Sequence, residues 1–188
     1  MGSYIALVAS SMIGTLVLLS FMRFTNDVNV SNYQDILEEI NYEQLVSLVE
    51  IIEADFALAG FQVNDPRTAP IVVARSSEFA FLRDEDGDGN LETVRYRLGD
   101  KNSADMTENP NDRMLFRSIN NGKEEPISAG LTTFYLSYLD GQGHGTSNLS
   151  KIRMLKVFVT VESTSPLDGR YARLPWATRI SPKNLLNY

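Results

Sequence analysis

The chain contains no cysteine and one histidine among its 188 residues. Without cysteine, it cannot form disulfides, use thiol catalysis or build zinc–thiolate sites. The single histidine, His144, lies in the glycine-rich stretch DGQGHGTSN, and no recognisable motif pairs it with a nucleophile. The sequence therefore predicts a protein that is not an enzyme.

Charged side chains are absent from the first 22 residues, and Arg23 is the first. The run YIALVASSMIGTLVLLSFM matches the roughly 20 helical residues that cross a bilayer. A cleaved signal peptide is disfavoured, because no basic residue precedes Tyr4 and the residues around Met22 make a poor cleavage site. A buried core helix is disfavoured too, because such helices are usually shorter and amphipathic. We expect residues 1–24 to form a single transmembrane helix.

Proline is absent before Pro66, and a second helical pattern follows the apolar run. Apolar residues of segment 31–59 recur at mostly three- and four-residue steps, which indicates an amphipathic helix. Its packed side is predicted to contain Leu37, Ile40, Leu45, Leu48, Val49, Ile52, Phe56 and Ala59. Gly60 fits a helix stop, so residues 25–61 should continue the stem. The link TNDVNVS (25–31) contains cap-forming residues, and a break, a kink or a melted stretch are all open there.

Basic residues are too few for a nucleic-acid surface. Lysine and arginine together number 17 against 24 acidic residues, which gives a net charge of −7. Phosphate binding needs clustered lysine and arginine, so no nucleic-acid partner is expected.

After Gly60 the hydrophobic period changes from helical to two. Strands are predicted at residues 71–83, with a break near Ser76 and Ser77, and at residues 91–98, 114–119, 131–139 and 152–161. The polar segment 100–113 should be a surface loop, and Trp176 a packing residue. A meander of antiparallel strands with one helix packed on it is an α+β architecture, with residues 62–188 as the β-rich globular domain.

Five segments, in their order along the chain, carry a family resemblance. They are EADFALAGF at the end of the second helix, EFAFLRDEDGDGNLETVRYRL, RMLFRSIN, SAGLTTFYLSYLDGQG, and WATRISPKNL near the C-terminus. Together with the apolar N-terminal helix they resemble the type IV pilin and type II secretion pseudopilin superfamily. The resemblance is greatest to the J-type minor pseudopilins and related minor pilins.

This resemblance implies a pilin-like fold, in which a long N-terminal helix packs on a C-terminal antiparallel sheet. It also implies a structural subunit of a type IV pilus-like or type II secretion filament. The implied partners are other pilin or pseudopilin subunits, bound through the N-terminal helix, and the inner-membrane assembly platform. The implied location is the inner membrane, with the C-terminal domain outside the cytoplasm and the subunit incorporated into a periplasmic or cell-surface filament. The alternative is a monomeric, membrane-anchored extracytoplasmic binding domain.

The fifth residue departs from the family pattern. Family members typically carry glutamate at the fifth mature position, and this chain has Ile5. If Met1 is the mature first residue, the resemblance implies a subunit at a filament end, which initiates or caps the filament. If Met1 is an initiator residue, there is no leader to cleave.

The sequence DEDGDGN (84–90) is the candidate metal site. Asp84, Asp86 and Asp88 follow the spacing of the first half of an oxygen-rich calcium loop, and Asn90 and Glu92 could add ligands. The bidentate glutamate expected at the twelfth position is replaced by Arg95, and the strand-like flanks exclude an EF-hand. Two interpretations are open: a hairpin loop that binds Ca²⁺, or a solvated turn of aspartate and glycine.

Overall fold

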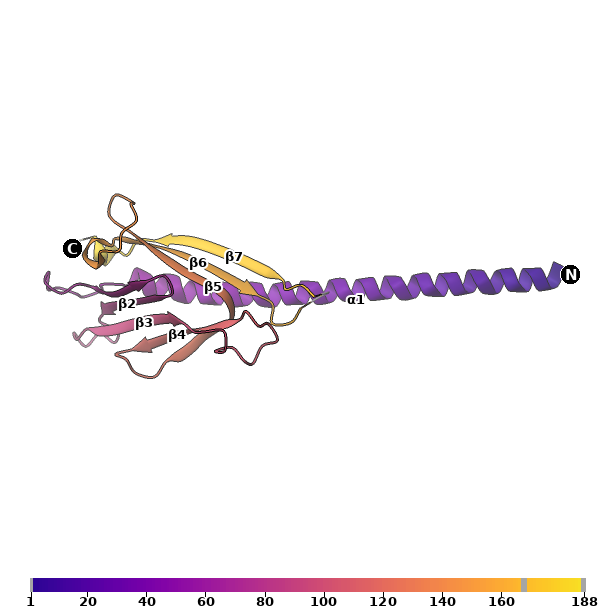
Figure 1. The fold of residues 1–188 in the computed structure, drawn as a ribbon, viewed down its shortest axis with the longest axis horizontal. Helices are drawn as coiled ribbons and strands as arrows, with labels where there is room; N and C mark the ends of the chain where they lie inside the picture. The colour runs from indigo at the N-terminus through magenta and orange to yellow at the C-terminus, as the bar shows by residue number, and fades with distance from the viewer. Residues whose placement is uncertain (1, 167–168, 187–188) are drawn as a thin grey trace. The chain divides into compact units, whose positions relative to one another are not determined.

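The structure is a computed structural model that describes residues 2–166 and 169–186. One long helix, α1 (Gly2–Ala57), is followed by a curled antiparallel sheet of seven strands, so the fold is α+β (Figure 1). The strands are β1 (Ile71–Arg75), β2 (Glu78–Arg83), β3 (Glu92–Leu98), β4 (Arg113–Ile119), β5 (Glu125–Leu139), β6 (Met154–Glu162) and β7 (Arg173–Ile180). Two short 3₁₀ turns, η1 (Leu149–Lys151) and η2 (Lys183–Leu185), complete the fold. The chain divides into two compact units, Met1–Glu39 and Ile40–Tyr188.

The first unit is helical throughout its described residues. The helix continues through residues 25–31, so the break considered for this link is absent from the secondary structure. The Thr25 hydroxyl donates to the carbonyl of Phe21 at 2.5 Å, which satisfies this cap-forming side chain inside the helix. By length and composition α1 can cross a membrane, and every side chain from Gly2 to Asn29 is exposed.

In the second unit, residues 40–57 of α1 pack one side into the core. The prediction is confirmed for Leu45, Leu48, Ile52, Phe56 and Ala59, all buried. It is wrong for Ile40, which is 44% exposed. The packed side of the helix instead includes Asn41, which is buried. Asn41 lies four residues before Leu45, and that spacing keeps the two side chains on one helix face. The Asn41 amide donates to the carbonyl of Ala172 at 3.5 Å.

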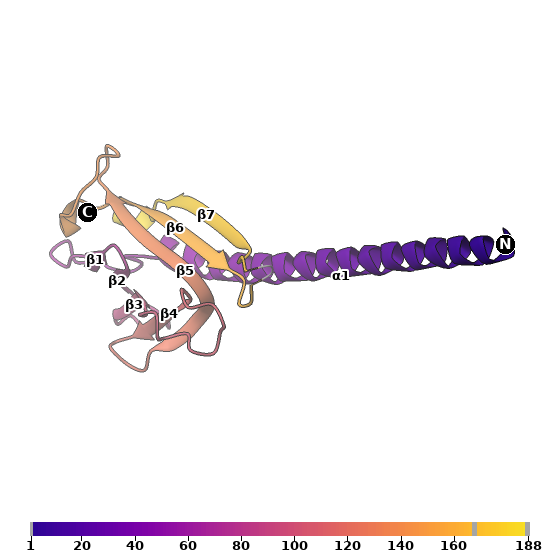
Figure 2. The same ribbon diagram turned by 45° about the vertical axis from the view of Figure 1, so that its right-hand side comes forward.

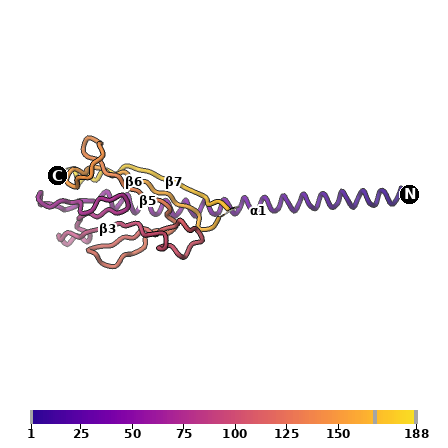
Figure 3. The backbone as a smooth tube through the Cα atoms, viewed as in Figure 1, coloured from indigo at the N-terminus to yellow at the C-terminus, as the bar shows by residue number. Residues whose placement is uncertain are grey.

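The seven strands pair in sequence order as a meander, with β1 and β7 at the two edges (Figures 2 and 3). The sheet curls so that the start and the middle of the meander meet. The Leu136 amide of β5 donates to the Ser76 carbonyl at 2.8 Å, and the Tyr138 hydroxyl donates to the Arg75 carbonyl at 2.8 Å. The hollow of the curl is filled by the apolar inner faces of the strands and by the packed side of α1.

Most of the predicted strands are confirmed. The expected interruption at Ser76 and Ser77 is the turn between β1 and β2, and segment 100–112 has no strand. The strand predicted at residues 131–139 begins earlier, at Glu125. The strand β7 was not expected. Its Pro175 disfavours a strand in the sequence, but an edge strand tolerates proline because one row of its N–H groups is unpaired.

Gly60 ends the helical region for a geometric reason. Its φ of +81° is a left-handed conformation that glycine adopts without strain. Its amide donates to the Leu82 carbonyl at 2.9 Å, which ties the end of the helix to β2. A Cβ atom here would lie 3.2 Å from both Pro70 Cβ and Leu185 Cδ2. The predicted helix stop is therefore also a close packing point.

Candidate functional site

The acidic turn between β2 and β3 brings three predicted metal ligands together. One carboxylate oxygen from each of Asp84, Asp86 and Asp88 lies within 4.8 Å of the other two. Asp84 is buried, whereas Asp86 and Asp88 are exposed. The turn therefore offers three convergent carboxylates, one of them anchored in the domain.

Hydrogen bonds within the turn explain its shape. Asp84 accepts the backbone N–H of Gly87 at 2.7 Å and that of Gly89 at 3.1 Å, one on each carboxylate oxygen. Asp88 accepts both the backbone and the side-chain N–H of Asn90, at 2.7 and 2.8 Å, and these bonds lower the pKa of Asp88. The turn is thus held by its own aspartates, as short aspartate and glycine turns commonly are.

The other two predicted ligands are directed elsewhere. Asn90 presents its amide nitrogen to Asp88, and Glu92 accepts the backbone N–H of Glu85 at 3.0 Å. The three aspartates fit a hard cation such as Ca²⁺, which prefers oxygen ligands. They fit a solvated turn as well, so the calcium site at Asp84, Asp86, Asp88, Asn90 and Glu92 stays a prediction.

A cluster of four ionic side chains lies directly beside the acidic turn. Asp55 of α1 accepts from Arg83 Nη2 at 3.1 Å and from Arg117 Nε at 2.8 Å. Glu85 of the turn pairs with the same two arginines, at 2.7 Å for Arg117 Nη2. The Tyr96 hydroxyl donates to Asp55. Two carboxylates and two guanidinium groups balance in charge, and together they join α1, β2, the turn and β4.

Burial and ion pairing shift the pKa values of the two acids in this cluster, Asp55 and Glu85, in opposite directions. Burial alone would raise the pKa of Asp55, but the hydrogen bonds from Tyr96 and Arg117 and the charges of Arg83 and Arg117 lower it. The pKa of Glu85 is lowered in the same way, with burial opposed by its bonds to the two arginines. Both carboxylates are therefore held ionised, which favours a structural role over proton transfer.

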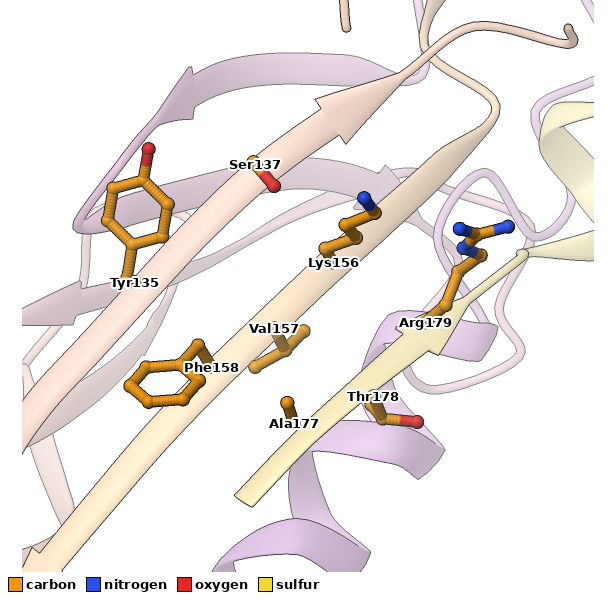
Figure 4. Close-up of a pocket in the computed structure, with 8 residues that line it drawn as sticks. All are labelled: Tyr135, Ser137, Lys156, Val157, Phe158, Ala177, Thr178 and Arg179. Atoms are coloured by element: carbon orange, nitrogen blue, oxygen red, sulfur yellow. The ribbon is translucent and has the colours of Figure 1, made fainter. Parts of the chain in front are cut away.

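The outer face of the sheet carries a depression of about 410 Å³ over β5, β6 and β7 (Figure 4). Tyr135 and Phe158 contribute aromatic surface, and they are 53% and 37% exposed. Lys156 and Arg179 add positive charge at one end (Figure 4). The depression therefore presents exposed aromatic and positively charged side chains on the outer face of the sheet.

The four-residue ionic cluster was missed from the sequence. Asp55 and Arg117 are 62 positions apart, and no local spacing pairs them. One feature of the sequence does point to Asp55. It falls between Ile52 and Phe56 and so borders the packed side of an amphipathic helix, where a charged side chain needs a partner.

In comparisons with known proteins, no family model matches the chain, and no curated protein and no solved structure matches it.

Proposed function

We propose that this protein is a minor pilin or pseudopilin, a membrane-anchored structural subunit that joins a type IV pilus-like or type II secretion filament and initiates or caps it. Its partners are other subunits of that filament, which contact its N-terminal helix, and the inner-membrane assembly platform. Its C-terminal domain lies outside the cytoplasm. The proposal rests on the resemblance of the chain's segments to that superfamily and on two properties of α1.

The observation that carries the proposal is that one helix has two different surroundings. Residues 40–57 of α1 contribute buried side chains to the sheet domain, as a structural helix does. In residues 2–24 of the same helix, every side chain is exposed, and the first charge comes at Arg23. An all-round apolar helix needs lipid or other apolar helices around it. A subunit that passes from membrane to filament core meets both requirements in turn.

Mechanical shearing provides the first test. Cells that express the tagged full chain are sheared, and the released fraction is separated from membranes. We expect the protein to be released together with long filaments or partner subunits. If it always stays in the membrane fraction, and if deleting its gene leaves piliation and secretion intact, the proposal fails.

The absence of cysteine allows a sharper test of the contact surface. A single cysteine at Leu16 or Leu19, both exposed on the apolar segment, would be the only thiol in the chain. Bismaleimide treatment of cells should then yield adducts between this chain and filament subunits that carry a matching cysteine in their own apolar helices. Lys123→Cys, in the exposed turn between β4 and β5, is the matched control and should give none. Equal yields from all three positions would contradict a helix-mediated contact.

A monomeric, membrane-anchored binding domain is the second candidate. It is favoured by the depression on the outer face of β5 to β7 and by the convergent aspartates of the acidic turn. Under this alternative the chain stays in the membrane fraction after shearing, and the cysteine variants give no adducts.

A further inference from the structure

Asp112 is an unusual residue in the sheet domain. It ends the loop of residues 100–112, just before β4, and its side chain is fully buried. Neither of its carboxylate oxygens has a well-formed hydrogen bond to a described residue, although the Thr107 hydroxyl lies near enough to lower its pKa. No described arginine or lysine forms an ion pair with it, and the adjacent Arg113 leaves its own Nε unpaired. A buried carboxylate in this state strongly destabilises the folded protein unless something compensates its charge.

A second carboxylate, that of Glu162, is linked to Asp112 through Asn109, which donates to Glu162 Oε2 at 3.1 Å and whose carbonyl accepts the Asp112 backbone N–H at 3.1 Å. Burial raises the pKa of Asp112, the Thr107 hydroxyl opposes this, and the negative charge of Glu162 raises it further. Arg173 is the described cation paired with Glu162, but it lies 3.8 Å away and is 60% exposed. An exposed pair at that distance compensates little charge. The negative charges of Asp112 and Glu162 are therefore compensated by little positive charge nearby.

The surroundings of Asp112 are rich in oxygen atoms. Val159 and Val161 of β6 point into the core, so Thr160 and Glu162 lie on the outer face of this strand. Thr160 is nevertheless fully buried, and its hydroxyl has no partner. The loop covers this end of β6, since Asn109 Nδ2 donates to Glu162 Oε2 at 3.1 Å and to the Ser163 carbonyl at 3.4 Å.

The strand register brings Asp112 to the same place. Arg113 of β4 is paired with Leu131 of β5, and Leu131 is paired with Val161 of β6. Continued by one residue, the register of β4 and β5 places Asp112 opposite Thr132, which lies in a β5 bulge and whose hydroxyl donates to the Thr160 carbonyl at 3.5 Å. Successive side chains of a strand alternate between faces, so Asp112 falls on the outer face that the loop covers.

We propose that Asp112 and Glu162 bind a divalent cation, Ca²⁺, between the loop of residues 100–112 and the end of β6. The Thr107 and Thr160 hydroxyls supply neutral oxygen ligands. The Thr107 hydroxyl lies 3.2 Å from the Ala104 carbonyl, so with a cation bound it can direct its proton there and its lone pairs toward the ion. All four proposed ligands bind through oxygen, which suits a hard cation such as Ca²⁺.

Such an ion compensates both carboxylates at once and fixes the loop on the sheet. This site is separate from the acidic turn at Asp84, Asp86 and Asp88, and it does not depend on the proposed function. Two other ways to compensate Asp112 are protonation of its carboxylate and hydration by a buried water. Each of them is an outcome that the following experiment distinguishes.

The test uses the full chain in detergent micelles after treatment with a chelator. The parent protein for the test carries Asp86→Asn and Asp88→Asn, which remove the exposed ligands of the acidic turn. Calorimetric titration with CaCl₂ should show one ion per chain, and the thermal midpoint should rise with added Ca²⁺. Adding Asp112→Asn should weaken binding at least tenfold and abolish the thermal shift. Glu108→Gln, which removes an exposed carboxylate of the same loop, should leave both unchanged.

The metal-free proteins give a second signature. Asp112→Asn replaces a buried charge by a neutral amide of similar size, so without Ca²⁺ its thermal midpoint should equal or exceed that of the parent. If the Asp112 variant does not fold, Glu162→Gln serves in its place and should also weaken binding at least tenfold. No heat and no thermal shift in the parent would mean that Asp112 is protonated or hydrated, and this would overturn the proposal. Binding that persists unchanged in the Asp112 or Glu162 variant would overturn it as well.

Discussion

Replacement of Asp55 by asparagine should strongly destabilise the sheet domain. The carboxylate of Asp55 contacts Arg83, Arg117 and Tyr96, and its side chain is only 16% exposed. After the substitution, two arginines share the single carboxylate of Glu85. Removing one partner of a buried ion pair typically costs about 3–5 kcal/mol, because the remaining charge is left without full compensation. We expect a loss in this range.

An exposed ion pair of the same domain provides the control. Arg97 and Glu124 form a bidentate pair, but their side chains are 40% and 38% exposed. Exposed pairs contribute about 0–1 kcal/mol, so Glu124→Gln should cost no more than that. Both substitutions replace one carboxylate by an amide, so the comparison isolates the effect of burial.

The assay is urea unfolding of the full chain in a nonionic detergent, followed by the fluorescence of Trp176. This residue is the single tryptophan of the chain and lies on β7, so the signal reports on the sheet domain. Midpoints multiplied by the slope of the transition give the change in the free energy of unfolding. If Asp55→Asn costs less than about 1 kcal/mol, as expected for Glu124→Gln, the buried cluster does not stabilise the domain as argued.

Three further predictions concern the same end of α1. Phe56→Ala should cost about 3–5 kcal/mol in the same urea assay, because Phe56 is fully buried among aromatic rings, whereas Ile51→Ala at a 38% exposed position should cost far less. Gly60→Ala should cost about 1 kcal/mol or more, because alanine is strained at φ +81°; an unchanged urea midpoint would contradict this. Because the pKa values of Asp55 and Glu85 are lowered on folding, their stabilisation is complete above about pH 5 and is lost progressively as the pH falls through the unfolded values toward the lowered folded values. Urea midpoints measured from pH 7 to pH 3 should therefore decline only at the acidic end, and less so in Asp55→Asn.

The regular elements were predictable because each depends on local periodicity. The packed side of α1 follows from three- and four-residue steps, and the inner faces of the strands follow from alternation. The error at Ile40 shows the limit of such patterns. Ile40 and Asn41 are adjacent, hydrophobicity favours the first, and the phase set by Leu45 selects the second.

The ionic contacts were not predictable, because they depend on how distant segments meet. Asp55, Arg83 and Arg117 come from α1, β2 and β4, and only the strand order brings them together. Asp112 was missed for a related reason. Its loop is polar and was correctly predicted to lie at the surface, but a polar sequence does not reveal that one of its carboxylates is covered.

The proposed function depends on how firmly α1 is held by the sheet domain. Ten leucine, isoleucine, valine and phenylalanine residues lie in segment 2–24, and their transfer from lipid to water would cost about 15–30 kcal/mol, at 1.5–3 kcal/mol per side chain. Burial of Leu48, Ile52 and Phe56 alone contributes about 5–9 kcal/mol, at 1.5–3 kcal/mol per side chain.

The contact between helix and sheet is therefore weaker than the cost of drawing the helix into water, so under the proposed function extraction requires the apolar helices of the filament to replace the lipid. Phe56→Ala weakens this contact by about 3–5 kcal/mol, so pulling on the domain should separate it from the helix before the helix leaves the membrane. We expect the Phe56→Ala protein to remain in carbonate-washed membranes at wild-type amounts but to be lost from sheared filaments. Ile51→Ala should behave as wild type in both fractions. Filament incorporation that is unchanged in Phe56→Ala would show that extraction does not act through this contact.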